Sequence, residues 1–400
     1  MSQKPFLSLL LALILLTLPG CWDRREMNDL AITVAMGIDR ADGEYTVTTQ
    51  VVQPGEVTAR KAGNSGQTPV TMYQAKGATL FEAIRRMTMT SPRKIYGAHL
   101  RVVLIGESLA REGVGEALDL LSRDYELRTD FYLMVAKGST AAQVLNIFTP
   151  LDKVPANKLY KSLQTAEKAW APATAVPLDQ FVADLVSRGR SPVLSGVVVS
   201  GDAAKGTTKQ NLDAISPPAQ LENAYMAVFR KDRLIGWLNE EDSKGYSYMV
   251  NKVKSTVGHI SCPQDGHIAV QVMHSEAKMK VTFQDGKPKL SVNLHVEQNV
   301  GEVECRIDLT RPETIEDLEK RSEQRLEQIL SHALKTAQTR YKTDYFGFGN
   351  SLHRSNPAAW EKVKSDWDRR FSEADFEIKA DVKIGRTGTV TNSFMEDLEE

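Results

Sequence analysis

The stretch HIAVQVMHSEAKMKVTFQDGKPKLSVNLHVEQNVGEVEC (267–305) alternates apolar and polar residues over most of its length. A period of two places the apolar side chains on one face of a β-strand. The alternation is interrupted at QDGKP (284–288), and its Asp-Gly pair is typical of a tight hairpin turn. The sequence therefore predicts an antiparallel β-meander that begins near residue 257.

A long helix is expected after the meander. Thr310, Pro312 and Glu313 predict a capping box with a proline at an early helical position. Apolar residues then recur at three- and four-residue steps, namely Ile315, Leu318, Leu326, Ile329, Ala333, Leu334, Ala337 and Tyr341. This stripe could bind a partner, but packing of the helix on its own sheet is the favoured interpretation. A second helix over 356–371 and a closing strand over 376–388 complete this part.

The first half of the chain alternates between the two kinds of pattern. Strand patterns occur at 29–39, 44–54, 70–77, 99–106, 130–138 and 191–202. Helical patterns occur after Thr79, which can cap a helix together with Glu82, and over 107–124, 140–150 and 155–190. We expect a break at Gly113 in the second of these helical regions and another near APATAVP in the last.

Composition and turn signals divide the chain into parts. Residues 203–220 contain few apolar side chains and a Pro-Pro pair, so we predict a long loop or linker there. A hairpin over 222–239, with Lys231 and Asp232 at its turn, and a helix over 240–253 follow. The expected division is a signal peptide at 1–20, an N-terminal α+β domain at 21–190, a central domain at 191–256, and a C-terminal meander and long-helix domain at 257–400.

The predicted fold class is α+β, in a multi-domain chain of mixed α/β character. The N-terminal part has a mixed sheet with helices, and the central part is a small hairpin and helix region. In the C-terminal part the antiparallel meander is packed with the long helix.

The first residues have the pattern of a lipoprotein signal peptide. Lys4 precedes an apolar run over 6–18, which is too short to cross a bilayer core that needs about 20 residues. Leu-Pro-Gly then leads to Cys21, which resembles a lipobox whose cysteine receives a diacylglycerol group. The alternatives are a conventional signal peptide with an incidental cysteine and an uncleaved anchor. Because two or more acyl chains hold a protein on a membrane, we expect the mature chain to be anchored through Cys21.

Bulk composition excludes some partners. Of 400 residues, 42% are hydrophobic and 25% are charged, as in ordinary folded proteins. Removing Lys4 with the leader leaves 49 basic side chains against 51 acidic ones, a formal charge of −2. This balance gives no electrostatic footprint for nucleic acid, so no nucleic-acid partner is expected.

Two cysteines remain after lipidation of Cys21. On the oxidising side of a membrane, Cys262 and Cys305 can form a disulfide, and we predict one. A zinc site is the competing interpretation, since His267, His274 and His295 lie between them, but their spacings match no zinc signature. No metal or other cofactor is expected.

The sequence does not favour catalysis. It contains no G-x-S-x-G elbow, no H-E-x-x-H and no P-loop. RDYELR (123–128) could hold a carboxylate pair in Asp124 and Glu126, but a solvated cluster of ion pairs or a subunit contact is favoured. GFGNSLHRSN (347–356) follows a helix and is a poor phosphate cradle. We expect no enzyme activity.

Four blocks resemble the Ger(x)C family, the lipoprotein C subunits of spore germinant receptors. The blocks follow one another in order and span nearly the whole chain. They are CWDRREMNDLAITVAMGID (21–39), GAHLRVVLIGESLAREGVGEALDLLSRDYELRTDFYLMVAKG (97–138) and AVFRKDRLIGWLNEEDSKG (227–245). The fourth block runs from LTRPETIEDLEKRSEQRLEQILSHALKTAQTRYKTDYFGFG (309–349) to VKIGRTGTV (382–390). The resemblance implies a non-enzymatic protein on the outer face of the spore inner membrane. It also implies integral-membrane A and B subunits as partners in a response to nutrients, and leaves open whether this subunit binds a small molecule.

Two further hypotheses concern function. The membrane-proximal residues Trp22, Asp23, Arg24, Arg25 and Glu26 could contact headgroups or a partner, or could be a plain tether; both interpretations are open. The alternative to a receptor subunit is an extracytoplasmic solute-binding lipoprotein that delivers a nutrient to a transporter. Two βαβ lobes would favour that alternative, and the C-terminal meander does not supply such a lobe.

Overall fold

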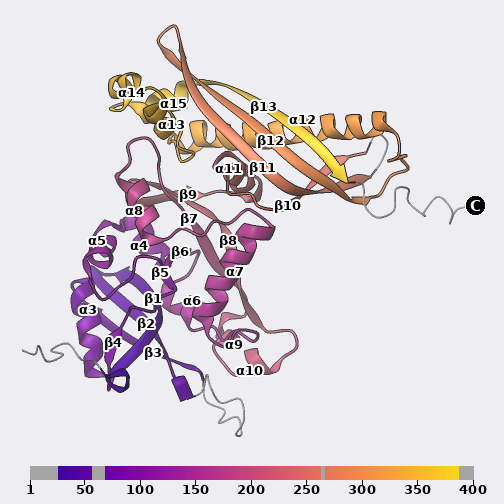
Figure 1. The fold of residues 1–400 in the computed structure, drawn as a ribbon. Helices are drawn as coiled ribbons and strands as arrows, with labels where there is room; N and C mark the ends of the chain where they lie inside the picture. Colours follow the sequence, from indigo (N-terminus) through magenta and orange to yellow (C-terminus); the bar gives the residue numbers. More distant parts are fainter. Residues whose placement is uncertain (1–25, 56–67, 263–265, 387–400) are drawn as a thin grey trace, which may run out of the picture.

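The computed structural model describes residues 26–55, 68–262 and 266–386. The chain is mixed α and β with two sheets, in agreement with the predicted α+β class. Figure 1 shows the N-terminal sheet with its helices in one part of the molecule and the C-terminal sheet with one long helix in the other.

The larger sheet has the strand order β3-β2-β1-β5-β6-β7-β8-β9, with β4 paired to β1. The pairs β1–β5, β5–β6 and β6–β7 are parallel, and β2, β3, β8 and β9 extend the sheet in antiparallel hairpins. The strands are β1 (Leu30–Ala41), β2 (Glu44–Val52), β3 (Val70–Gly77), β4 (Lys94–Tyr96), β5 (Val102–Gly106), β6 (Tyr132–Ala136), β7 (Val193–Gly201), β8 (Ala219–Arg230) and β9 (Arg233–Trp237).

Helices cover both faces of this sheet. One face packs against α3 (Leu80–Arg86), α4 (Glu107–Glu112), α5 (Gly115–Arg123) and α8 (Leu178–Val186); the other packs against α6 (Ala141–Leu145) and α7 (Pro155–Ala169). Both faces being covered explains why β5 is buried throughout, as its unbroken apolar run predicts. Thr79 accepts from the Glu82 N–H and Gly113 ends α4, both as predicted.

The smaller sheet has the order β10-β11-β12-β13. Its strands are β10 (Thr256–Ser261), β11 (His267–Gln284), β12 (Lys287–Val303) and β13 (Asp375–Arg386). The predicted turn is confirmed, with Asp285 and Gly286 both at positive φ. The closing strand β13 pairs with β12 in parallel, so the sheet is an antiparallel meander with one parallel edge strand.

The long helix α12 (Pro312–Thr336) packs on this sheet, and its last apolar positions continue through η3 (Ala337–Tyr341). Figure 1 shows α12 running along the strands. Leu318, Leu326, Leu334 and Tyr341 of the predicted stripe are buried. The favoured interpretation of the stripe, packing within the chain, is therefore confirmed.

Three details differ from the sequence analysis. The predicted capping box at Thr310 is wrong, because Arg311 is the N-cap of α12, without a side-chain bond, and Thr310 instead bonds to Asp308; Pro312 does start the helix. The second helix is divided into α14 (Pro357–Val363) and α15 (Trp367–Glu373). A further helix, α13 (Phe348–Ser355), and the short β4 were not predicted.

The predicted linker at 203–220 is packed against the larger sheet. It contains α9 (Ala203–Gly206) and α10 (Gln210–Asp213), and Asn211 within α10 is fully buried. The Asn211 amide donates to the carbonyls of Phe148 and Ala219 and accepts from the Ala219 N–H. One buried polar side chain thus fixes a segment whose composition is that of a loop.

The boundary expected at residues 190 and 191 falls inside the larger sheet, since β7 pairs with β6 on one side and β8 on the other. The hairpin β8–β9 continues this sheet, and α11 (Glu240–Met249) then leads to the smaller one. As a division into independently folding units, the expected domain scheme stays a prediction.

Candidate interaction sites

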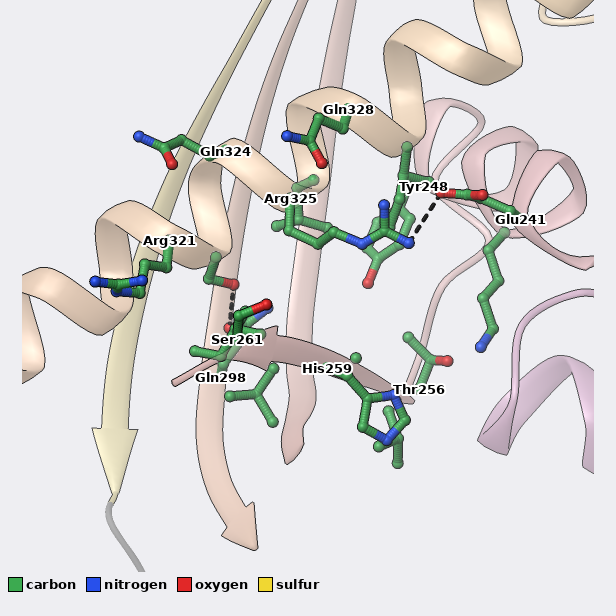
Figure 2. A pocket seen from close by; sticks show the side chains of 18 of the residues that line it. Glu241, Tyr248, Thr256, His259, Ser261, Gln298, Arg321, Gln324, Arg325 and Gln328 are labelled. Atoms are coloured by element: carbon green, nitrogen blue, oxygen red, sulfur yellow. Dashed lines mark hydrogen bonds and ion pairs between the residues drawn. The ribbon is translucent and has the colours of Figure 1, made fainter. Parts of the chain in front are cut away.

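A polar groove lies between α11, α12 and β10. Its volume is about 610 Å³. Figure 2 shows α12 on one side, with Arg321, Gln324, Arg325 and Gln328, and β10 on the other, with Thr256, His259 and Ser261. We call this hollow the α12–β10 groove.

Ion pairs and hydrogen bonds order the walls of the groove. Arg325 pairs with Glu241 of α11 at 3.0 Å, and Ser322 donates to Gln298 at 2.7 Å (Figure 2). Ser322 and Gln298 are both buried, so this bond fixes the depth of α12 over the sheet. The groove can therefore offer hydrogen bonds and charge to a polar partner.

One cation of the groove is held on an aromatic ring. The Lys244 ammonium lies 3.8 Å from the centroid of the Trp170 ring and 3.1 Å from Glu240. Trp170 ends α7 in the N-terminal part, and its carbonyl accepts from the Thr256 hydroxyl at 2.8 Å. These contacts fix the start of β10 against the N-terminal part of the molecule.

A buried carboxylate organises the loop that precedes α13. Asp344 accepts from the N–H groups of Gly347 and Gly349, each at 2.8 Å, and from the indole N–H of Trp367 at 2.9 Å. Burial raises the pKa of Asp344 to about 6, against the lowering effect of these three donors. The stretch 347–356, noted above as a poor phosphate cradle, holds its shape through the chain's own carboxylate.

The same loop joins the two parts of the molecule. Gly189, in the loop between α8 and β7, packs directly on Gly349 and Asn350. Ser187 donates to Asn350 at 2.9 Å, and the Ser191 N–H donates to the Asp344 carbonyl at 2.7 Å. We call this contact between 187–191 and 343–350 the junction; it is a structural connection that sequence patterns did not indicate.

The predicted anchor residues lie mostly outside the described residues. Cys21, Trp22, Asp23, Arg24 and Arg25 belong to that segment, and Glu26 is the first described residue and is exposed. The Glu26 carbonyl accepts from the Asp29 N–H at 3.0 Å, one residue before β1 begins. After the expected tether, the described chain forms the short helix η1 (Met27–Asp29) and then enters the larger sheet.

Cys262 and Cys305 are joined by a disulfide in the structure, with their Cα atoms 6.2 Å apart. Both cysteines are buried beside Ile260, Ile268 and Leu318, where the ends of β10 and β12 meet the first turns of α12. Among the described residues, no group of three or more His, Cys, Asp or Glu side chains is placed to hold a metal ion.

The charged cluster at 123–128 is a set of separate surface pairs. Glu126 bonds to Lys94 at 2.5 Å, whereas Asp124 accepts the Glu126 N–H at 2.9 Å. The Glu126 carboxylate is therefore held in an ion pair, and the Asp124 carboxylate holds the backbone of Glu126, so both have structural roles. Tyr125 is 84% exposed at the rim of an apolar hollow that includes Phe81.

Sequence reasoning did not find the groove or Asp344. Asp344 had one local signal, an acid in the aromatic and glycine-rich run TDYFGFG (343–349), which is a place where a carboxylate can cap a tight turn. No short stretch of sequence indicates the groove, because β10 and α12, which line it, are about 70 positions apart in the chain.

Within the described part of the chain, no helix is long and apolar enough to cross a membrane.

Comparison with known proteins covers almost the whole chain. Residues 23–199 match the family model "Spore germination protein N-terminal domain", and residues 224–388 match "Spore germination B3/GerAC like, C-terminal". The spore germination protein KC of Bacillus subtilis (strain 168) is 34% identical over 399 residues, which cover 98% of both chains. The spore germination protein B3 of the same organism is 27% identical and covers 94% of this chain and 96% of its own.

A solved structure is similar in fold. The crystal structure of the GerBC protein aligns with a TM-score of 0.54 at 22% identity, covering 87% of this chain and 96% of that one. The likeness shows that the two chains share a fold.

Proposed function

The chain belongs to the GerAC-like family of spore germination proteins, and on that premise we propose that it is the lipid-anchored, non-enzymatic C subunit of a nutrient germinant receptor. The observation that carries the proposal is the match from end to end. A relative named as a spore germination protein aligns over 98% of both chains, with no large region of either left over. Integral-membrane A and B subunits are the proposed partners.

The proposed anchor is a diacylglycerol thioether on Cys21, on the outer face of the spore inner membrane. Its support is the apolar run over 6–18 followed by Leu-Pro-Gly-Cys. Lipid attachment would concentrate the chain in the plane of the membrane subunits, which raises the effective concentration of partners without new contacts.

Replacing the anchor cysteine tests this role. Cys21→Ala should leave the fold unchanged, because the described structure begins at residue 26, yet release the protein from spore membranes and weaken germination. Membrane fractionation and nutrient-triggered loss of optical density are the measurements. Ser200→Ala, an exposed substitution at the end of β7, is the matched control. Full germination with a wholly soluble mutant protein would contradict the anchored role.

The membrane-proximal residues Trp22 to Glu26 are proposed to set the distance between the anchor and the folded body. Inserting a flexible spacer of about ten residues after Glu26 adds reach without touching the fold. Reduced germination with unchanged membrane attachment supports the distance role, whereas unchanged germination shows that these residues are a plain tether.

The partner proposal is tested by crosslinking in intact spores. Mass spectrometry should then identify A and B subunits among the peptides attached to this chain. A solute-binding lipoprotein is the alternative role, and isothermal titration of the full chain with nutrients separates the two. Micromolar binding by the isolated chain would support the alternative.

The disulfide is part of the same proposal, because an extracytoplasmic location permits it. Closing a loop across a separation of 43 residues stabilises the folded chain by about 4 kcal/mol in the chain-entropy model. Peptide mapping without reduction should recover Cys262 bonded to Cys305. Recovery of both cysteines as free thiols from native spores would refute the pairing.

A further inference from the structure

The two edges of the smaller sheet differ in how their outer backbone groups are satisfied. On β13, the N–H groups of Ala380, Val382 and Ile384 point away from β12 and donate to side chains of α12. Their acceptors are Glu327, Glu323 and Glu319, at 3.1, 3.2 and 2.9 Å. A four-residue step along the helix thus matches a two-residue step along the strand. We call these three side chains the glutamate ladder.

At the opposite edge, β10 has no strand beyond it within the described residues. The Cys262 N–H donates to the Gly266 carbonyl, so positions 262 and 266 form a hydrogen-bonded pair of the antiparallel ladder. Because such pairs alternate, Thr256, Gly258 and Ile260 also bond to β11. The N–H and carbonyl groups of Val257, His259 and Ser261 therefore point outward, into the α12–β10 groove.

The helix sorts its charges between the two edges. The glutamate ladder occupies the side of α12 that faces β13, whereas Arg321, Arg325 and the glutamines Gln324 and Gln328 occupy the side that faces the groove. The groove side of α12 thus contributes two guanidinium groups. The groove as a whole is lined by Lys244, Arg321 and Arg325 against Glu240 and Glu241, which leaves one positive charge in excess. Figure 2 shows the four groove-side residues Arg321, Gln324, Arg325 and Gln328 on α12, above β10.

The two arginines keep donors available for a further partner. Arg325 pairs with Glu241, and Arg321 pairs with Asp317 at 2.6 Å. A guanidinium carries five N–H donors, so a single carboxylate leaves some of them for another acceptor. About half of the Arg325 side chain and a third of the Arg321 side chain are exposed.

We propose that β10 is a docking edge for an extended, carboxylate-bearing segment of a partner protein, which adds a fifth strand to the sheet inside the α12–β10 groove. The main chain of the segment pairs with Val257, His259 and Ser261, and its acidic side chains meet Arg321 and Arg325. Strand addition of this kind takes affinity from the main chain and specificity from side chains. The free edge strand, the groove beside it and the charge of the facing helix surface together define the occupant.

A proline at the docking edge tests the main-chain role. His259→Pro removes an outward N–H and leaves the ladder bonds to β11 in place, whereas His259→Ala removes only the imidazole. The probe is a fluorescent peptide of alternating valine and glutamate, titrated into the full-length protein in detergent. We expect His259→Pro to weaken binding about tenfold or more and His259→Ala to change it less than about twofold.

The charge of the occupant is tested with a second peptide, in which lysine replaces glutamate. It should bind about tenfold more weakly than the glutamate peptide. In the unsubstituted protein, saturation with the glutamate peptide should slow hydrogen exchange at the amides of Val257 and His259, a readout that needs no variant.

Three results would overturn the proposal. They are equal affinity of the His259→Pro and His259→Ala proteins, equal affinity for the lysine peptide, and no binding of the glutamate peptide at millimolar concentration. Concentration-dependent dimers that disappear in His259→Pro would assign the edge to a second copy of this chain and would also overturn it. The assay uses no spores, so its failure leaves the proposed role in germination untouched.

Discussion

At the scale of single residues, the carboxylate of Asp344 is held in place by the groups around it. Its carboxylate is buried and accepts three N–H donors, and it lies within the loop that contacts the N-terminal part. An amide in this place would turn an NH2 group toward N–H donors, because it has one acceptor oxygen instead of two.

Asp344→Asn should destabilise the chain and change its pH dependence. We expect a loss of about 1–3 kcal/mol in the free energy of unfolding at pH 7, from the unsatisfied buried donors. Urea unfolding followed by tryptophan fluorescence measures it. The exposed Asp213→Asn should change the value by less than about 0.5 kcal/mol.

The sign of the pH effect follows from the raised pKa of Asp344, about 6 in the folded chain against an ordinary value of 3.8. The folded state binds this proton more tightly than the unfolded state does. The resulting stabilisation is complete below about pH 4 and is lost as the pH rises through about 6. The difference in free energy of unfolding between the unsubstituted protein and Asp344→Asn should therefore narrow from pH 4 to pH 7; a constant difference would contradict the raised pKa.

At the scale of elements, α12 satisfies one edge of the smaller sheet and leaves the other free. The glutamate ladder replaces the hydrogen bonds that a neighbouring strand would accept from β13. Edge strands with unpaired backbone groups are prone to pair with other chains, so a ladder of this kind protects β13. β10 is the other edge of this sheet, and no strand lies beyond it within the described residues.

Glu323→Ala should remove the middle hydrogen bond of the glutamate ladder, which Glu323 accepts from the Val382 N–H. Loss of one acceptor for the Val382 N–H is expected to cost about 1 kcal/mol and to speed hydrogen exchange at that amide. Glu316→Ala is the control, because Glu316 is an exposed residue on the same helix. Unchanged protection of Val382 in Glu323→Ala would show that the ladder does not protect the edge.

At the scale of the whole molecule, the two parts share one hydrophobic core. Val193, Met226 and Val228 of the larger sheet pack in the same cluster as Tyr345, Phe346 and the inner face of the smaller sheet. The junction at 187–191 and 343–350 closes one side of this shared core. The parts are therefore held together by buried apolar area as well as by hydrogen bonds.

Gly189→Ala tests how tightly the junction is packed. A Cβ at this position would lie 2.6 Å from the backbone nitrogen of Asn350 and 2.7 Å from the carbonyl carbon of Gly349. Because both contacts are to backbone, we expect a loss of about 1–3 kcal/mol in the free energy of unfolding, measured by urea titration. At Gly301 the new Cβ would meet only the Ala269 oxygen at 3.5 Å, so Gly301→Ala should be neutral. Equal stability of the two variants would show that the junction is loosely packed.

Local patterns were sufficient for most elements. The break at Gly113, the turn at Asp285 and Gly286, and the apolar stripe of α12 were predicted because each depends on neighbouring residues alone. The two short helices in the predicted loop at 203–220 were not foreseen, because the order of this segment depends on the side chain of Asn211 bonding to backbone groups up to 63 residues away. The site residues behave in the same way, since the groove is lined by segments distant in sequence.

The sequence by itself determined the α+β class, the family and the position of most strands and helices, because backbone preference and apolar periodicity act over a few residues. Only the tertiary structure decided that β7 to β9 extend the first sheet, that Asp344 is buried at the junction, and that the two edges of the second sheet differ. These features arise from pairing between distant segments. Whether a strand edge or an acidic side chain such as Asp344 is covered depends on which surface packs against it.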